Sequence, residues 1–448
     1  MRTKEKEYLD LTRCKIVEGL VLFALPMIAG DLLQQFYNIT DTLIVGKFIG
    51  SNALAAVGSA YSLMTFLTSV FLGLSMGAGV LFSIELGKQN MHRLRSAIFH
   101  AFFLVMVITA VINILLFILA DPLLHFLSVP DEIYEDMKAY LLIIFTGLMA
   151  TSLYNYFACL LRAVGNSVIP LVFLGSSALM NIGLDLLFVP VFQWGIQGAA
   201  AATVISQYVS GIGISLYFLM RCRRFVPKAD ERRFDAGVLR DILGLSCMTC
   251  VQQSCMNFGI LLVQRLVDSF GTITMAAFAA GVKIDTFAYL PVQDFGNAFS
   301  IFISQNCGAG NMERQRKGFR AATLISLAFS ALISFLVVVF AGPLMRIFVR
   351  AEESAVLASG VRYLRIEGAF YIGIGCLFLL YGLYRGIGRP GISVILTVVS
   401  LGTRVVLAYL LAPVIGETGI WMAVPIGWFL ADMIGYGWYF LKRSDWFQ

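Results

Sequence analysis

Long apolar segments separated by short polar loops dominate this chain. A helix needs about 20 predominantly apolar residues to cross the hydrocarbon core of a bilayer. The sequence supplies twelve segments of this kind, and we predict a spanning helix in each of them. Their approximate bounds are 16–42, 52–84, 97–120, 138–160, 168–190, 197–220, 240–263, 275–306, 319–343, 357–383, 391–413 and 420–441.

The pattern occurs twice along the chain. When Gly271 is placed over Gly50, the spaced Ser, Gly, Asn, Met, Arg and Arg residues of segment 83–95 coincide with those of segment 304–316. With a small change of register, Gly165 also aligns with Gly388. The chain therefore reads as two six-helix halves. Because six is even, both halves begin on the same side of the membrane, as in transporters built from parallel repeats.

Basic residues indicate which side that is. Cytoplasmic loops of membrane proteins carry an excess of Lys and Arg. Here the basic residues lie in the loop 88–95, in the segment 221–240, and around Arg385 and Arg389, whereas the acidic cluster 131–136 lies on the opposite side. We therefore expect both termini in the cytoplasm. The predicted domains are an N-terminal bundle (1–220), a basic cytoplasmic linker (221–240) and a C-terminal bundle (241–448).

Composition supports an all-α polytopic membrane protein. Of the 448 residues, 59% are hydrophobic and only 13% are charged, and the mean hydropathy is +0.82. A soluble protein of this size would carry about 25% charged residues. The net charge of +6 does not indicate binding to nucleic acid, because the basic residues lie in short loops between apolar spans. The expected surroundings are a lipid bilayer.

The sequence contains little that indicates catalysis or a cofactor. Cys247 and Cys250 form a C-x-x-C pair, but no second pair follows and the chain has three histidines, which favours packing over a metal or redox site. The G-x-G-x-x-G pattern at 386–391 follows no predicted strand, which argues against a nucleotide site. We find no His-rich or Ser/His/Asp set and expect no enzyme activity, no cofactor and no resident metal.

The first predicted span carries unusual polar chemistry. It contains Pro26 near its start and the carboxylate Asp41 near its outer end. An ionisable group in a spanning helix is costly and usually faces a protein interior or a wet cavity. A proline removes one backbone donor and permits a bend. These two features suit a cation-driven conformational switch, although a capped carboxylate at the helix end and a passive kink would look the same in sequence.

Three further polar residues fall at a depth similar to that of Asp41. Asn181 and Asp185 lie four residues apart, hence on one face of the fifth span, and Thr203 lies near the outer end of the sixth. Two carboxylates, an amide oxygen and a hydroxyl can share protons or bind Na⁺, because nearby buried carboxylates resist joint ionisation. A structural hydrogen-bond network would use the same residues, and spacing alone does not separate the two interpretations.

The second half does not repeat this set. Leu262 aligns with Asp41, and Arg404 falls about opposite Asp185. The charged residues within its own spans are Lys283, Asp285, Asp294, Glu367, Arg404 and Asp432. A buried pair of Arg404 with Glu367 or Asp432, with a structural role, is expected.

Several polar and aromatic residues could line a substrate cavity, although core or lipid packing explains each of them singly. They are Gln34, Tyr37, Asn38, Tyr61, Tyr154, Asn257, Lys283 and Asp294.

Four segments give the chain a resemblance to a known family. They are FALPMIAGDLLQQFYNITDTLIVGKFIG (23–50), ALAAVG (53–58), LLRAVGN (160–166) and GVKIDTFAYLPVQDFGNAFSIFISQNCGAGN (281–311). Over nearly its full length the chain resembles the multidrug and toxic compound extrusion (MATE) transporters. The resemblance implies a V-shaped pair of bundles with a central cavity in a bacterial plasma membrane. It also implies a monomer that exports amphipathic organic cations in exchange for H⁺ or Na⁺.

Within that family, the chain resembles most the branch with a cation site in the first bundle. The motif residues of that branch fall on Asp41, Asn181, Asp185 and Thr203, and its helix-1 proline falls on Pro26. In that branch, protonation is proposed to bend helix 1. The other branch keeps an acid in helix 7, where this chain has Gln252, Gln253 and Asn257. Lys283 matches the basic position usual in helix 8.

Other classes of function fit the sequence less well. A flippase for lipid-linked precursors, from the same superfamily, would have a more cationic central cavity and often extra helices. A membrane-embedded enzyme would need a catalytic constellation, and a passive channel would not need buried carboxylates. We therefore favour a coupled exporter, driven by H⁺ in preference to Na⁺.

Overall fold

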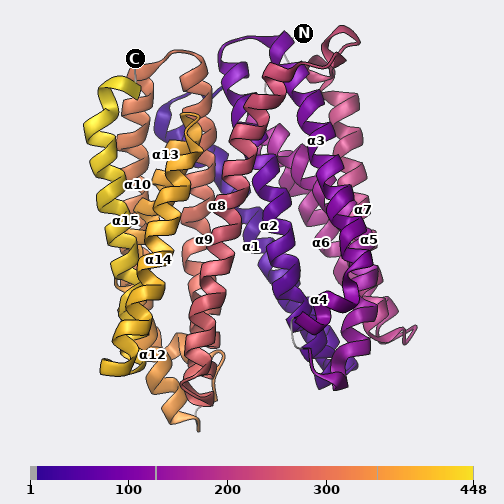
Figure 1. Ribbon diagram of the computed structural model, residues 1–448, viewed down its shortest axis with the longest axis vertical. Helices are drawn as coiled ribbons and strands as arrows, with labels where there is room; N and C mark the ends of the chain where they lie inside the picture. Colours follow the sequence, from indigo (N-terminus) through magenta and orange to yellow (C-terminus); the bar gives the residue numbers. More distant parts are fainter. Residues whose placement is uncertain (1–7, 127–128, 351, 447–448) are drawn as a thin grey trace. The chain divides into compact units, whose positions relative to one another are not determined.

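The computed structural model describes residues 8–126, 129–350 and 352–446, and in these residues the regular structure is helical, with no strand (Figure 1). Ten of the described helices are long and apolar enough to cross a membrane, or eleven when one bent pair is counted as a single span. The predicted all-α polytopic membrane fold is therefore confirmed. The ends of the predicted bundles, residues 1–7 and 447–448, lie outside the described residues.

In the described residues, seven α-helices precede the linker and eight follow it, coloured in chain order in Figure 1. In the first half these are α1 (Ile16–Phe48), α2 (Ser51–Gly87), α3 (Met91–Ile118), α4 (Ala120–Phe126), α5 (Asp131–Ala163), α6 (Val168–Phe188) and α7 (Gly195–Arg221). The linker holds two short 3-10 helices, η2 (Arg223–Phe225) and η3 (Asp230–Arg232). The second half comprises α8 (Ala236–Asp268), α9 (Thr272–Gly308), α10 (Met312–Val339), α11 (Ala341–Arg346), α12 (Ser354–Gly368), α13 (Tyr371–Gly386), α14 (Pro390–Ile415) and α15 (Glu417–Trp446).

Two predicted spans differ from the helices observed. The predicted span 357–383 consists of α12 and α13, which meet at an angle of 51°. The break follows Gly368, and glycine weakens a helix because its backbone has more freedom to lose. The predicted span 240–263 lies within α8, which is not among the ten apolar helices. Three amide residues in its middle make it more polar: Gln252, Gln253 and Asn257.

The backbone confirms the repeat. Two of the aligned glycine pairs adopt positive φ, a conformation that side chains disfavour: Gly50 (124°) with Gly271 (92°), and Gly165 (96°) with Gly388 (75°). The structure adds two short helices that the sequence did not predict, α4 and α11, which begin at equivalent positions of the repeat, Ala120 and Ala341. The two halves therefore share turns and short helices as well as spans.

By its internal contacts the chain forms two compact units. Unit 1 contains the described parts of Met1–Leu9 and Ala29–Cys250, and unit 2 contains the described parts of Asp10–Ile28 and Val251–Gln448. The linker 221–240 therefore belongs to unit 1. The boundaries between the units fall inside α1 and α8, the first helix of each repeat, so each of these helices contributes to both units.

Within unit 1, the first part of α8 packs closely on α2. A Cβ atom added to Gly77 would lie 2.4 Å from the Cα atom of Ser246, and one added to Gly73 would lie 2.5 Å from the Cα atom of Cys250. Ser246 Oγ also donates a hydrogen bond to the carbonyl oxygen of Leu74, at 2.9 Å. Small residues are what allow helix backbones to approach this closely.

In each repeat, an arginine at the same position anchors the beginning of the first helix. In unit 1, Arg93 of α3 forms an ion pair with Asp241 of α8. In unit 2, Arg314 of α10 donates hydrogen bonds to the carbonyl oxygens of Leu11, at 3.1 and 3.2 Å, and of Cys14, just before α1. Arg93 and Arg314 occupy the same position of the repeat, so the repeat extends to the way in which its first helix is anchored.

Unit 1 also holds its linker through buried contacts. Phe225 is buried with the apolar residues of α2, α3, α5 and α7. Glu231 is buried, and it accepts hydrogen bonds from Arg95 Nη1, at 3.1 Å, and from the backbone N–H of Lys228, at 2.8 Å. The linker is therefore a packed part of its unit, as buried charges with hydrogen-bonded partners indicate.

In unit 2, α9 and α13 approach each other through glycines. A Cβ atom added to Gly382 would lie 2.3 Å from the carbonyl oxygen of Gly296. Nearer the other end of α9, Phe278 stacks on Trp421 with ring centroids 5.5 Å apart. This packing places the middle of α13 directly beside α9, which shapes the pocket described below.

Candidate functional site

The four predicted coupling residues meet inside unit 1. Asp41 comes from α1, Asn181 and Asp185 come from α6, and Thr203 comes from α7. The side chains of Asn181 and Asp185 are 2% and 0% exposed, whereas Asp41 and Thr203 are half-buried. The four-residue spacing on α6 puts Asn181 and Asp185 on one face of the helix, and that face is turned toward the interior of the unit.

Only part of this polar cluster is held by hydrogen bonds between its own members. Asn181 Nδ2 donates to Thr203 Oγ1 at 3.4 Å, and Thr203 Oγ1 donates to the carbonyl oxygen of Ala199 at 3.1 Å. The first of these bonds connects α6 to α7 and fixes which end of the Asn181 amide points toward α7. The oxygen of that amide is therefore turned away from the threonine.

The carboxyl groups of Asp41 and Asp185 lie within hydrogen-bonding reach of each other. Several buried oxygen atoms in the cluster nevertheless have no donor among the described residues. They are Asp41 Oδ1, Asn181 Oδ1, Asp185 Oδ1 and Asp185 Oδ2. A buried acceptor without a donor costs about 1–3 kcal/mol, and more when it is charged. The cluster therefore has the composition of a site that needs a proton or a small cation.

Aromatic side chains surround the two carboxylates. Tyr37 of α1 and Tyr140 of α5 both lie within electrostatic reach of Asp41 and Asp185. Tyr37 is also near Tyr61 and Tyr154, two other predicted cavity residues; the hydroxyl of Tyr154 donates to the carbonyl oxygen of Pro170 at 3.0 Å. Gln34 and Asn38, also predicted for the cavity, lie half-buried on α1.

Tyr140 was not among the predicted site residues, although the repeat contained a signal for it. It aligns with Tyr363 when the two halves are superposed in sequence. In unit 2, Tyr363 and Tyr371 both donate hydrogen bonds to the buried carboxylate of Asp285. Each half therefore places a tyrosine of the same repeat position near a buried carboxylate.

The acids of unit 2 are held differently from those of unit 1. Asp285 is bonded by the two tyrosine hydroxyls, and Glu367 is buried within electrostatic reach of Arg404. No salt bridge joins Arg404 to Glu367 or to Asp432 in the part of the chain that the structure describes. The predicted ion pair is thus replaced by a looser electrostatic contact.

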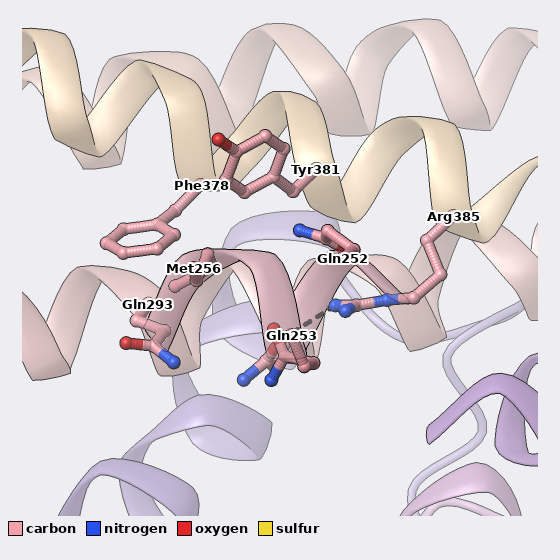
Figure 2. Close-up of a pocket in the computed structure, with 8 residues that line it drawn as sticks. Gln252, Gln253, Met256, Gln293, Phe378, Tyr381 and Arg385 are labelled. Carbon is pink, nitrogen blue, oxygen red and sulfur yellow. Dashed lines mark hydrogen bonds between the residues drawn. The ribbon is translucent and has the colours of Figure 1, made fainter. Parts of the chain in front are cut away.

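A second polar site lies between α8, α9 and α13 of unit 2, and we call it the amide pocket. Figure 2 shows Phe378, Tyr381 and Arg385 extending from α13 toward the polar side chains of α8 and α9. The hollow between these side chains measures about 10 Å³, which is room for about one water molecule. Its lining residues are Gln252, Gln253, Met256, Gln293, Asn297, Phe378, Tyr381 and Arg385.

Most of the amide pocket could not be assigned from the sequence. Arg385 was counted there as a cytoplasmic loop residue, but the structure buries it to 3% exposure at the end of α13. Helical spacing was the available signal, because Gln293 and Asn297 are four residues apart and Phe378, Tyr381 and Arg385 follow at steps of three and four. What the sequence could not supply was the pairing of the three helices.

The remaining predicted cavity residues lie in unit 2 but do not line this pocket. Asn257 Nδ2 donates to the carbonyl oxygen of Gln253 within α8, at 3.4 Å. Lys283 is exposed on α9. Asp294 is buried, and its Oδ1 atom lies 3.5 Å from Asn297 Nδ2. Their part in binding a substrate stays a prediction.

Comparisons with known proteins cover nearly the whole chain. A family model described as MatE matches residues 26–187 and 247–410. The "Probable multidrug resistance protein YpnP" of Bacillus subtilis (strain 168) is 27% identical over 433 residues, which cover 96% of each protein. The "Probable multidrug resistance protein NorM" of Thermotoga maritima is 25% identical over 94% of this chain and 90% of its own length.

Solved structures agree with the fold. A structure described as the outward-facing conformation of a multidrug resistance MATE family transporter of the MOP superfamily matches with a TM-score of 0.92 at 21% identity. The match covers 97% of this chain and 98% of that one. At this level of identity the likeness establishes the arrangement of the helices and leaves the chemistry to the residues themselves.

Proposed function

Because this chain belongs to the MatE family of multidrug efflux transporters, we propose that it is a secondary antiporter that exports amphipathic organic cations in exchange for H⁺. It is a transporter and not an enzyme. We place it in the bacterial plasma membrane as a monomer with both termini in the cytoplasm. The two bundles, 1–220 and 241–448, would move relative to each other during the cycle.

The observation that carries this proposal is the set of buried acceptors without donors around Asp41 and Asp185. One proton placed between two carboxyl groups within hydrogen-bonding reach converts a repulsive contact into a hydrogen bond. The Asn181 oxygen can accept from the same group once it is protonated. A structural network would instead need donors at these atoms, so we favour the coupling role.

The position of Pro26 suggests how the proton would act on the helix. Pro26 lies inside α1, and the boundary between the two units follows directly after it, between Ile28 and Ala29. The missing backbone N–H makes bending easier at this point than elsewhere in the helix. A change in charge at Asp41, farther along the same helix, would therefore favour one bend angle over another.

Binding energy for the exported cation would come from the same residues. While both carboxylates are ionised, they and the nearby rings of Tyr37 and Tyr140 attract an organic cation. Protonation removes this attraction and displaces the cation. The proton and the drug would then compete for the same carboxylates, so that binding of one displaces the other.

Na⁺ is the alternative coupling ion. The oxygen atoms of Asp41, Asn181, Asp185 and Thr203 form the kind of all-oxygen set that hard cations accept. A flippase for lipid-linked precursors is not favoured, since the relatives compared above are named for multidrug resistance. The two ions therefore remain to be separated by experiment.

The test is transport by purified protein in liposomes. An imposed pH gradient with balanced Na⁺ should drive uptake or release of a fluorescent organic cation, and an imposed Na⁺ gradient with balanced pH should not. Transport under the Na⁺ gradient alone would refute proton coupling and leave the site in place. Absence of transport under both gradients, in protein that folds, would refute the antiporter itself.

A further inference from the structure

We propose that the linker of unit 1 binds the anionic headgroups of phospholipids through an exposed basic surface. We call this surface the basic face, and it consists of the side chains of Arg223, Lys228, Arg233 and Phe234, all of which are exposed. It shares no residue with the carboxylate cluster or with the amide pocket. The proposal therefore goes beyond ion-coupled export and does not rest on it.

Arg95 of α3 folds the linker into a compact shape. Its side chain is only 15% exposed, and its Nη1 atom donates to Glu231 Oε1 in η3, at 3.1 Å. Its Nε atom donates to the carbonyl oxygen of Arg224 in η2, at 2.8 Å. Arg232 closes the turn between these two short helices by donating to the carbonyl oxygen of Pro227, at 3.1 and 3.2 Å. One guanidinium therefore holds η2 and η3 close to each other, and the basic face is displayed on a folded segment.

The carboxylates of the linker have partners inside unit 1. Glu231 is buried and bonded as described above. Asp235 Oδ1 accepts hydrogen bonds from two backbone N–H groups in the first turn of α8, at 2.8 and 3.1 Å, which is how an acidic residue caps the beginning of a helix. Asp230 is exposed, and its Oδ2 atom lies 3.9 Å from His92 Nε2 on α3. The acids of the linker are therefore directed at other groups than its basic side chains.

The basic side chains of the linker keep their charge available to a partner. Residues 221–240 contain seven Arg or Lys and three Asp or Glu, so their formal net charge is +4. Among the described residues, none of the seven forms an ion pair with a carboxylate. Exposed Arg and Lys side chains of this kind attract phosphate groups, which Arg can bind in a bidentate way. The charge of the basic face is therefore complementary to an anionic headgroup.

The position of the basic face favours phospholipid over a soluble polyanion. The candidate span α7 has 27 residues and ends at Arg221, directly before η2. A helix of this length rises about 40 Å, which is about the thickness of a bilayer with its headgroup regions, so the linker begins among the headgroups. Phe234 is 77% exposed beside Arg233. An aromatic side chain next to basic ones is typical of segments that lie in the membrane interface, and clustered Arg and Lys residues there select anionic lipids.

Photocrosslinking of the full-length protein in nanodiscs tests this assignment. The photoreactive amino acid p-benzoylphenylalanine replaces Phe234 and keeps an aromatic ring there. The nanodiscs contain equal amounts of phosphatidylcholine and phosphatidylglycerol, and mass spectrometry counts the lipid adducts at residue 234 after irradiation. Adducts with phosphatidylglycerol should exceed those with phosphatidylcholine at least threefold. In 1 M NaCl, where the screening length is about 3 Å, the ratio should fall toward one.

Two matched triple variants locate the binding surface. The first combines Arg223→Gln, Lys228→Gln and Arg233→Gln, and its ratio of adducts should fall toward one at low salt. The control removes the same charge from three exposed arginines of unit 2 that form no ion pair among the described residues, and it should keep the original ratio: Arg346→Gln, Arg350→Gln and Arg365→Gln. If the first variant fails to fold, the single Arg233→Gln change replaces it, and the salt dependence of the unchanged linker still decides.

Several results would overturn the proposal. They are the absence of lipid adducts at residue 234, equal numbers of the two adducts at low salt, a ratio that a folded first variant leaves unchanged, or adducts with a co-purified protein or nucleic acid in place of lipid. The assay needs neither a drug nor an ion gradient. Its failure therefore leaves the proposed proton coupling untouched, and failure of coupled transport in liposomes leaves the binding of lipid by the linker untouched.

Discussion

Asp41 of α1 and Asp185 of α6 bring two carboxyl groups within hydrogen-bonding reach, and in the described residues no basic side chain forms a salt bridge with either. Two anions at this separation repel each other unless a proton or a cation lies between them. Because the two groups belong to different helices, the state of charge at this point is tied to the distance between α1 and α6.

Asp41→Asn should abolish gradient-driven export while the protein still folds and inserts. The amide has nearly the shape of the carboxyl group but cannot change its charge, so it holds the cluster in a single state. Drug accumulation in cells and transport in liposomes measure the loss. Asp131→Asn, which alters an exposed carboxylate at the start of α5, is the matched control and should export at the wild-type rate. Wild-type efflux by a well-folded Asp41→Asn protein would contradict the assignment.

Changes to the acids of unit 2 should affect stability or substrate range more than ion dependence. Asp285→Asn leaves one of two tyrosine hydroxyls facing an N–H group in place of an acceptor, which should cost about 1–3 kcal/mol of stability. Thermal unfolding followed by size-exclusion chromatography measures this loss, with the exposed Asp268→Asn as control. Glu367→Gln and Asp432→Asn complete the series. If one of the three sets the pH or Na⁺ dependence of transport while Asp185→Asn does not, coupling lies in unit 2.

Gly77→Ala should destabilise the contact between α2 and α8. The new Cβ atom would lie 2.4 Å from a backbone atom of Ser246, so the two helices have to separate. Overpacking of this kind costs about 1–3 kcal/mol, and the melting temperature should fall accordingly. Gly58→Ala on the same helix is the matched control, because nothing lies within 4 Å of its new Cβ atom. Equal melting temperatures for the two variants would show that α8 does not pack on α2 in this way.

The contact between Asp121 of α4 and the side chains of Tyr134 and Lys138 of α5 should contribute less stability at acidic pH. Asp121 accepts hydrogen bonds from Lys138, at 2.6 Å, and from Tyr134, at 2.8 Å, and these partners hold the pKa of the Asp121 carboxyl below its ordinary value of 3.8. A carboxyl whose pKa is lower in the folded state stabilises the protein above its unfolded pKa. That contribution is lost as the pH falls through the folded value.

Thermal unfolding measured between pH 7 and pH 3 checks this expectation. Asp121→Asn should remove a small part of the loss of stability below about pH 4, where an unpaired Asp carboxyl titrates, and should have little effect at pH 7, because exposed ion pairs contribute little. If the variant loses as much stability between pH 4 and pH 3 as the wild-type protein does, the contact of Asp121 with Lys138 and Tyr134 does not persist in solution.

The sequence predicted the helices and the proximity of the candidate coupling residues for a clear physical reason. Long apolar runs have one stable form in a bilayer, and a spacing of four residues puts Asn181 and Asp185 on one face whatever surrounds them. The bend between α12 and α13 was missed because the apolar run continues through it. Arg385 was misplaced because counting basic residues near span ends does not show which of them is buried.

The oxygen atoms without donors and the amide pocket could be found only from the packing of several helices. Whether Asp185 Oδ1 finds a donor is decided by the rotamers of side chains on α1, α6 and α7 together. Likewise, Gln252, Gln293 and Tyr381 share a pocket only because glycines let α9 approach α13. The spacing of residues along one helix does not reveal which helices pack together, so neither relationship could be predicted.

The boundaries inside α1 and α8 bear on how such a chain could arise. The opening turns of each repeat's first helix are grouped with the helices of the other repeat. A six-helix polypeptide with the same contacts would therefore lack a partner for the opening turns of its first helix. Two copies inserted in the same orientation would supply that partner by exchanging these turns, as swapped homodimers do. Fusing two such genes through a segment like 221–240 makes the exchange intramolecular and independent of protein concentration.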